Sequence, residues 1–146
     1  MRGLGATWSP RGDGILFICF NDQYASQADF RLCMMSADGS GLRVLTTEWS
    51  NSPFFTPDGT RIAFVCEGGL CLMKPDGSDR TRWPIGGSQF AWAPNAKLLA
   101  FHCGVDEPGR FNDEICAVSG DGTNFRNLTR NPGIDYSPSF SPLSSQ

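Results

Sequence analysis

The sequence predicts an all-β fold built from repeated, four-stranded antiparallel sheets. Two observations support this prediction. The 146 residues include 17 Gly, 10 Pro and 11 Phe, a composition that favours short strands and tight turns, because Gly and Pro occupy turns while Phe packs on pleated surfaces. In addition, one order of motifs occurs three times along the chain. Hydrophobic residues make up 40% of the sequence, which is enough for a packed core.

Each repeat has the same order of elements. A strand ending in an aromatic residue is followed by a Pro-containing turn, an apolar strand, a variable loop, a third strand, an Asp-Gly turn and a short fourth strand. In the middle repeat the four strands are expected at residues 52–55, 61–66, 70–73 and 80–83. In the first repeat they are expected at 4–8, 15–19, 32–35 and 42–45, and in the third at 89–92, 98–103, 115–118 and 125–128.

A single four-stranded sheet buries too little apolar surface to be stable alone. Repeated sheets of this kind stack face to face, as the blades of a β-propeller do. We therefore expect a partial β-propeller over residues 1–146, whose three repeats would make half of a six-bladed ring. Its blades are expected at about 4–47, 50–85 and 88–130, with a further first strand at 136–142.

The motifs resemble a known repeat. The run Phe55-Thr56-Pro57-Asp58-Gly59, the following Ile62-Ala63-Phe64 and the closing segment 133–142 are similar to the TolB-like (WD-like) β-propeller repeat, and the resemblance covers nearly the whole chain. It implies blades of the kind that build six-bladed propellers in periplasmic translocation proteins and that accompany tricorn-like and prolyl-oligopeptidase-like peptidases. Two departures, Pro94-Asn95-Ala96 in place of Pro-Asp-Gly and an extra Gly12-Asp13, fall in turns and leave the fold prediction unchanged.

Three blades are fewer than the roughly four to eight that close a propeller. The sequence leaves two interpretations open: a fragment of a longer protein, or half of a ring that a second copy completes as a homodimer of three plus three blades. The homodimer is favoured because it would cover unpaired strand edges and apolar blade faces. One strand would then be redundant, and either residues 4–8 or residues 136–142 would occupy the innermost position of the joining blade.

The six cysteines occupy equivalent places in the repeats. Three end second strands and three lie in third strands, which predicts the disulfides Cys19–Cys33, Cys66–Cys71 and Cys103–Cys116. A Gly68-Gly69 turn would place Cys66 directly opposite Cys71, with Cα atoms about 4.5 Å apart. Reduced thiols buried as small apolar groups are the alternative, and zinc is disfavoured because the pairs belong to different blades. Disulfides imply an extracytoplasmic compartment, periplasmic or secreted, with any signal peptide outside this chain.

Charge and hydropathy argue against two classes of partner. The formal net charge is -3, and the 12 Lys and Arg residues are scattered rather than clustered, so nucleic acid is not an expected partner. No apolar run approaches the roughly 20 residues that a membrane-spanning helix requires. The expected partners are a second copy of the chain and a protein or peptide ligand.

Function is expected at the rim that carries the variable loops, residues 21–30 and 104–112. The candidates for ligand or metal binding at the channel mouth are Glu48, Trp49, Asn51, Gln89 and Asp135. The acidic loop candidates, which could attract a basic peptide or hold calcium, are Asp106, Glu107, Asp113 and Glu114. Solvated loop carboxylates are the simpler interpretation of the second group.

The leading functional prediction is a non-enzymatic binding or assembly module that self-associates to complete a six-bladed ring. No catalytic residue is assigned, because His102 is the only histidine and no Gly-x-Ser-x-Gly motif accompanies it. The alternative is a calcium-dependent hydrolase that acts on esters, lactones or phosphoesters at the central channel. No cofactor other than calcium is expected, and whether the chain is an enzyme stays open.

Overall fold

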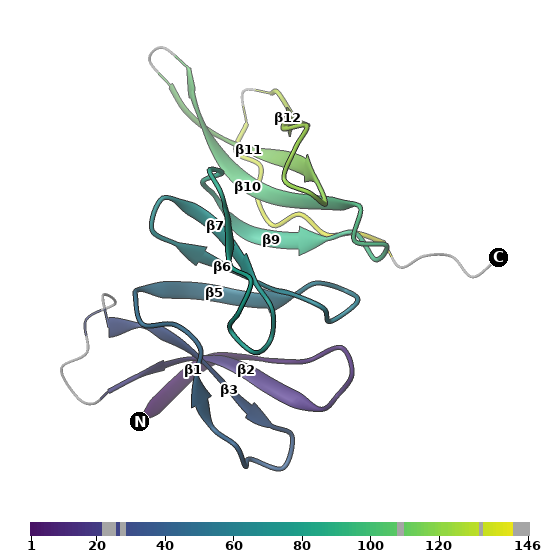
Figure 1. The fold of residues 1–146 in the computed structure, drawn as a ribbon. Helices are drawn as coiled ribbons and strands as arrows, with labels where there is room; N and C mark the ends of the chain where they lie inside the picture. Colours follow the sequence, from purple (N-terminus) through teal and green to yellow (C-terminus); the bar gives the residue numbers. More distant parts are fainter. Residues whose placement is uncertain (22–25, 27–28, 108–109, 132, 142–146) are drawn as a thin grey trace. The chain divides into compact units, whose positions relative to one another are not determined.

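The computed structural model contains twelve β-strands and no α-helix among the residues that it describes. These are residues 1–146 without 22–25, 27–28, 108–109, 132 and 142–146, and without the side chains of 105–107 and 110–111. The strands form three four-stranded antiparallel sheets (Figure 1), which confirms the predicted all-β class. The chain divides into two compact units, Met1–Pro84 and Ile85–Gln146. No helix in the described part is long and apolar enough to cross a bilayer.

The first unit holds two sheets whose strands pair in sequence order. The first sheet consists of β1 (Arg2–Trp8), β2 (Gly14–Phe20), β3 (Arg31–Ser36) and β4 (Arg43–Val44). The second consists of β5 (Ser50–Phe55), β6 (Ile62–Cys66), β7 (Gly69–Met73) and β8 (Thr81–Trp83). The fourth strands are shorter than expected, since β4 joins β3 through only the pairs Cys33↔Val44 and Met34↔Arg43.

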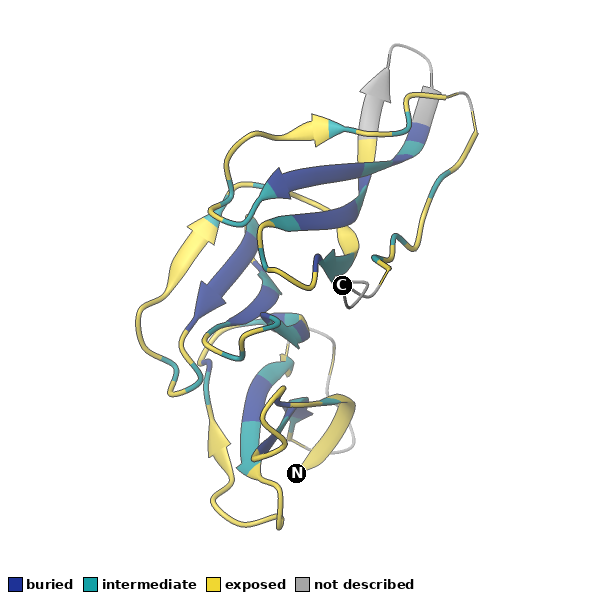
Figure 2. Ribbon diagram, turned by 90° about the vertical axis from the view of Figure 1, so that its right-hand side faces the viewer, coloured by how far each residue is buried: buried dark blue, intermediate teal, exposed yellow. Residues whose placement is uncertain are grey.

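The two sheets of the first unit pack face to face. One buried cluster combines side chains from both sheets: Leu16, Ile18 and Leu32 from the first with Ile62, Phe64, Cys66, Cys71 and Met73 from the second. Burying each large apolar side chain contributes about 1.5–3 kcal/mol. Figure 2 shows the buried residues concentrated in the central strands of the sheets, while the turns and the outer strands β1, β4 and β8 are mostly exposed.

The structure contains three disulfides, and they join the predicted partners. They are Cys19–Cys33, Cys66–Cys71 and Cys103–Cys116. Each bridge links the second and third strands of one sheet, with Cα atoms 5.7–5.8 Å apart.

The expected register of the middle bridge is wrong. Cys66 pairs with Gly69, while Cys71 pairs with Phe64, so the disulfide joins diagonal neighbours rather than residues directly opposite each other. The difference arises in the turn, because Gly68 adopts a φ of 78° and the two-residue loop is Glu67-Gly68. Glycine at this place supplies the positive φ that a tight hairpin requires.

The second unit holds the third sheet. Its strands are β9 (Ser88–Trp92), β10 (Leu98–Glu107), β11 (Arg110–Ser119) and β12 (Arg126–Asn127), with β9 at one edge and β12 at the other. The sequence predicts a variable loop over residues 104–112, but most of this range is strand. Pairing between β10 and β11 continues without interruption to Glu107↔Arg110, so the two strands form one long hairpin.

The first strand of every sheet contains a bulge. The register shifts between Leu4 and Thr7 in β1 and between Asn51 and Phe54 in β5, and the partner of β9 shifts between Ala100 and His102. The bulged residue has a positive φ in each case: 62° at Gly5, 47° at Ser52 and 52° at Gln89. A bulge bends a strand and changes where its side chains point.

The segment after the third sheet resembles these first strands in local conformation. Ser137 stands at the place of the bulged residue and has a φ of 60°. The Asp135 N–H donates a hydrogen bond to the Asp113 carbonyl at 2.7 Å, and in the same way the Ser50 N–H at the start of β5 donates to the Phe30 carbonyl at 3.0 Å. Residues 136–141 nevertheless form no strand, and residue 142 lies outside the described residues. A strand needs a hydrogen-bonded neighbour, so the predicted further first strand stays a prediction.

Candidate functional site

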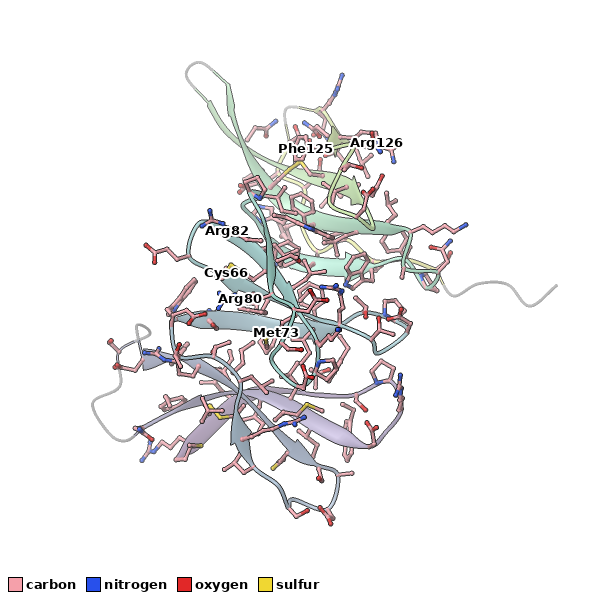
Figure 3. The ribbon with its side chains drawn as sticks, viewed as in Figure 1. Cys66, Met73, Arg80, Arg82, Phe125 and Arg126 are labelled. Carbon is pink, nitrogen blue, oxygen red and sulfur yellow. A yellow bond between two sulfur atoms is a disulfide. The ribbon has the colours of Figure 1, made fainter. Side chains whose placement is uncertain are left out.

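Glu48, the first channel-mouth candidate, forms an ion pair with Arg80. Its other carboxylate oxygen accepts a hydrogen bond from Thr47 Oγ1 at 2.9 Å. Arg80 precedes β8 (Figure 3), and its guanidinium also lies 5.1 Å from the centre of the Phe64 ring. Partial burial lowers the pKa of Arg80 from its ordinary value, but an arginine in a protein stays charged. The Glu48 carboxylate is therefore already engaged by a cation from its own unit.

The other two candidates of the first unit lie near Glu48 in the chain. Trp49 is half-buried directly before β5. Asn51 is the second residue of β5, and its Oδ1 accepts a hydrogen bond from the Ser52 N–H at 2.7 Å. That contact supports the bulge at Ser52.

In the second unit, Gln89 and Asp135 both contact the segment that follows the third sheet. Gln89 Oε1 accepts hydrogen bonds from the Ser137 N–H at 2.7 Å and from Ser137 Oγ at 3.2 Å. Asp135 Oδ2 accepts from Asn131 Nδ2 at 2.5 Å. The Gln89 oxygen thus holds the segment on the third sheet, whereas the Asp135 oxygen makes a contact within the segment.

Glu114 is a buried carboxylate rather than a loop residue. It lies in β11 and is 2% exposed. Asn112 Nδ2 donates to its Oε1 at 2.6 Å, and Thr129 Oγ1 donates to its Oε2. Asn112 also donates to the Asn131 carbonyl at 2.6 Å. A buried charge requires such partners, and this network ties β11 to the chain after β12.

The remaining acidic candidates separate from one another. The backbone of Asp106 and Glu107 ends β10, whereas their side chains lie outside the described residues. Asp113 belongs to β11 and is 43% exposed. Among the described residues, no three His, Cys, Asp or Glu side chains gather in a way that could hold a metal ion.

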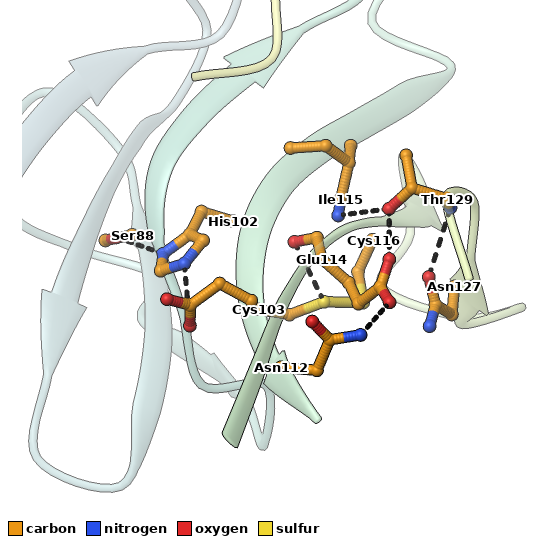
Figure 4. The surroundings of a disulfide bond; sticks show 10 residues. Ser88, His102, Cys103, Asn112, Glu114, Ile115, Cys116, Asn127 and Thr129 are labelled. Carbon is orange, nitrogen blue, oxygen red and sulfur yellow. Dashed lines mark hydrogen bonds and ion pairs between the residues drawn. A yellow bond between two sulfur atoms is a disulfide. The ribbon is translucent and has the colours of Figure 1, made fainter. Parts of the chain in front are cut away.

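Sequence reasoning missed one constellation, which consists of Ser88, His102 and Asp113. Ser88 Oγ lies 2.9 Å from His102 Nδ1 (Figure 4). His102 Nε2 lies 3.1 Å from Asp113 Oδ1. The three residues come from β9, β10 and β11. The sequence contains one signal for this site, because His102 lies on an expected strand and points to the opposite face from Cys103. The bulge that places Ser88 opposite His102 could not be predicted from the sequence.

The carboxylates of the repeated Asp-Gly turns have a structural role, as their sequence context predicts. In each turn the carboxylate accepts hydrogen bonds from the N–H and hydroxyl of the Ser or Thr two residues later, which holds the pKa of Asp38, Asp58, Asp76 and Asp121 below its ordinary value. At Asp58 the largest cause is a third hydrogen bond, donated by Thr56 Oγ1 at 2.6 Å.

Comparison with solved structures identifies the fold. The chain is similar to a putative TolB from Agrobacterium tumefaciens, with a TM-score of 0.65 and 22% identity over 87% of this chain and 50% of that one. It is also similar to a chain of a nidogen/laminin complex (TM-score 0.64, 18% identity, 90% of this chain and 50% of that one). A puromycin hydrolase matches with a TM-score of 0.72 and 16% identity over 96% of this chain and 24% of that one.

These likenesses show that the chain has a TolB-like β-propeller fold, in which the three sheets are blades. The chain spans about half the length of the Agrobacterium TolB structure. No protein-family model matches the sequence, and no curated protein matches it either. Neighbours with this fold include both TolB proteins and hydrolases.

Proposed function

We propose that this chain is an assembly module of the TolB-like propeller type, whose first blade binds the third blade of a second copy so that two chains complete a six-bladed ring. Protein or peptide ligands would then bind at the channel mouth of the ring. The observation that carries the proposal is an apolar face on the first blade, at whose edge Trp8 is exposed. That face reproduces, position by position, a face that is buried in the second blade.

The buried face belongs to the second sheet, where Phe55 pairs with Ile62, Ile62 with Met73, and Phe64 with Cys71. All five residues belong to, or pack against, the apolar cluster between the first and second sheets. This face of the blade is therefore the one that packs on a preceding blade.

The first sheet repeats this pattern with Trp8 paired with Ile15, Ile15 with Met35, and Phe17 with Cys33. Trp8 is 58% exposed in the chain by itself. Ile15, Phe17 and Met35 are half-buried, whereas Cys33 is buried. A large apolar side chain that is exposed beside such a face indicates an interaction surface. The likeness of this face to the buried face of the second sheet indicates that the partner is another blade of the same type.

A second copy provides such a blade. The third sheet carries Ala100, His102, Ile115 and Ala117 at the places of Leu16, Ile18, Leu32 and Met34 in the first sheet, by the shared strand pairing. A ring of two chains would be closed by twofold symmetry, which is the commonest symmetry of soluble oligomers. The three disulfides support an oxidising, extracytoplasmic compartment for this assembly.

Light scattering on a size-exclusion column tests the proposal. The wild-type chain should elute as one species with twice the monomer mass of 15.9 kDa. Trp8→Asp places a charge on the joining face and should yield monomers, whereas Asn21→Asp adds the same charge outside the blade face and should remain dimeric. A monodisperse wild-type monomer would show that the proposal is wrong.

A further inference from the structure

Three neighbouring strands bring a serine, a histidine and an aspartate onto one face of the third sheet. His102 pairs directly with Ser88 across β10 and β9. Asp113 pairs with Gly104, two residues after His102 in β10, and therefore lies on the same face of the sheet. The imidazole is 23% exposed and touches both partners, with Ser88 Oγ at 2.9 Å from Nδ1 and Asp113 Oδ1 at 3.1 Å from Nε2.

The two contacts of the imidazole assign its hydrogen. A carboxylate only accepts hydrogen bonds, so the neutral ring carries its proton on Nε2 and donates it to Asp113. Nδ1 is then an acceptor for the Ser88 hydroxyl proton. A serine next to an oriented base is an arrangement that nucleophilic catalysis uses. In the common triad Nε2 faces the serine and Nδ1 the aspartate, whereas here Nδ1 faces Ser88 and Nε2 faces Asp113.

We propose that Ser88 is a nucleophile activated by His102 and that the chain hydrolyses small carboxylic esters at this site. Asp113 is a positioning residue, because it orients the imidazole and contacts no reacting atom. All three residues belong to the second unit, so one chain holds the complete constellation.

The reaction balances without a cofactor. Ser88 Oγ attacks the ester carbonyl carbon as its proton passes to His102 Nδ1. The bond from the carbonyl carbon to the alcohol oxygen then breaks, and the alcohol leaves with that proton. Water attacks the acyl-serine, gives a proton to His102, and releases the carboxylic acid as Ser88 Oγ recovers the proton.

The site is accessible. Ser88 is exposed at the start of β9, so a small ester can reach its hydroxyl. The equivalent residue of the first sheet, Leu4, pairs with Ile18 as Ser88 pairs with His102. Leu4 stays 42% exposed although its partner Ile18, which stands at the place of His102, is only 3% exposed under the second sheet. A blade added to the third sheet would therefore cover the imidazole but leave the position of Ser88 open at its edge.

Covalent labelling with a fluorophosphonate probe, followed by peptide mass spectrometry, tests whether Ser88 is activated. Ser78 is an internal reference, because its hydroxyl is also exposed and lies 2.6 Å from a carboxylate, Asp76 Oδ1, but no histidine contacts it in the described structure. We expect labelling at Ser88 and not at Ser78, and loss of labelling in Ser88→Ala and His102→Gln. Equal labelling of both serines in the wild type would overturn the proposal.

Hydrolysis of p-nitrophenyl acetate gives the second measurement. His102→Gln should lower the rate about 100-fold or more, the usual effect of a general base, while Ser78→Ala should leave it unchanged. Asp113→Asn should lower the rate of ester hydrolysis without lowering the melting temperature. A wild-type rate equal to that of Ser88→Ala would overturn the proposal even if His102→Gln failed to fold.

A chelator separates this site from the calcium-dependent hydrolase predicted as the alternative. The Ser88 reaction needs no metal, so EDTA should leave both labelling and ester hydrolysis unchanged. Ester hydrolysis that EDTA abolishes and calcium restores would contradict the Ser88 mechanism and support the metal-dependent one.

Discussion

At the scale of single residues, Gly87 determines how closely β9 approaches β10. A Cβ atom at this position would lie 2.4 Å from the His102 carbonyl oxygen and 2.7 Å from Phe101 Cδ2. Neither distance is possible without movement of the strands. The neighbouring Gly86 has no atom within 4 Å of the same construction, so the two glycines form a natural pair for comparison.

We predict that Gly87→Ala lowers the free energy of unfolding by about 1–3 kcal/mol, the usual cost of forcing an extra group into a packed site. Gly86→Ala, in open space, should change it by less than about 0.5 kcal/mol. Urea denaturation of both variants measures the difference. Equal effects of the two substitutions would contradict the role given to Gly87.

For the polar candidates Glu48 and Asp135, the sequence predicted a position in the repeat but not the residues that they contact. Glu48 and Asp135 were predictable as rim residues, because they precede or begin first strands in the repeat. The hydrogen-bond and ion-pair partners of these residues could not be predicted. Arg80, which binds Glu48, lies 32 residues further along the chain. The contact of Asn131 with Asp135 depends on the side-chain conformation of Asn131. Whether any of these residues binds a ligand stays a prediction.

At the scale of elements, the disulfides fasten the central hairpin of each sheet. Cys66–Cys71 closes a span of 5 residues and Cys19–Cys33 a span of 14. All four of these cysteines are buried, so replacing either pair removes similar apolar surface. The two bridges therefore differ mainly in how much they restrict the unfolded chain.

We predict that the Cys66→Ala/Cys71→Ala double variant loses about 2 kcal/mol of stability and the Cys19→Ala/Cys33→Ala variant about 3 kcal/mol, following the loop-length dependence of chain entropy. Urea denaturation under non-reducing conditions measures both. The opposite order would mean that contacts of the bridge in the folded state outweigh its effect on the unfolded chain.

At the scale of the whole molecule, the Asp-Gly turns link stability to pH. The pKa values of Asp38, Asp58, Asp76 and Asp121 are lowered in the folded chain by hydrogen bonds from Ser and Thr. A carboxyl whose pKa is lower when folded than when unfolded stabilises the fold above its unfolded pKa, and this contribution is lost as the pH falls through the folded pKa. The affected range therefore lies below the ordinary aspartate value of 3.8.

We predict that the melting temperature falls as the pH is lowered from 4 toward 2. The double variant Ser78→Ala/Thr123→Val removes the hydroxyl donors of two turns and should flatten this part of the profile. Ser139→Ala, at an exposed serine outside the turns, should not. Scanning calorimetry across this range makes the comparison, and identical profiles for the three proteins would contradict it.

Local sequence patterns predict the repeated unit, its four-stranded order, the all-β class and the pairing of the six cysteines. These patterns are the alternation of apolar residues, the turn residues and the equivalent spacing of the cysteines. The diagonal register of Cys66–Cys71 and the contacts of His102 with Ser88 and Asp113 become evident only in the folded chain. Register depends on which residues of a turn take a positive φ, and a single bulge changes which side chains meet across three strands.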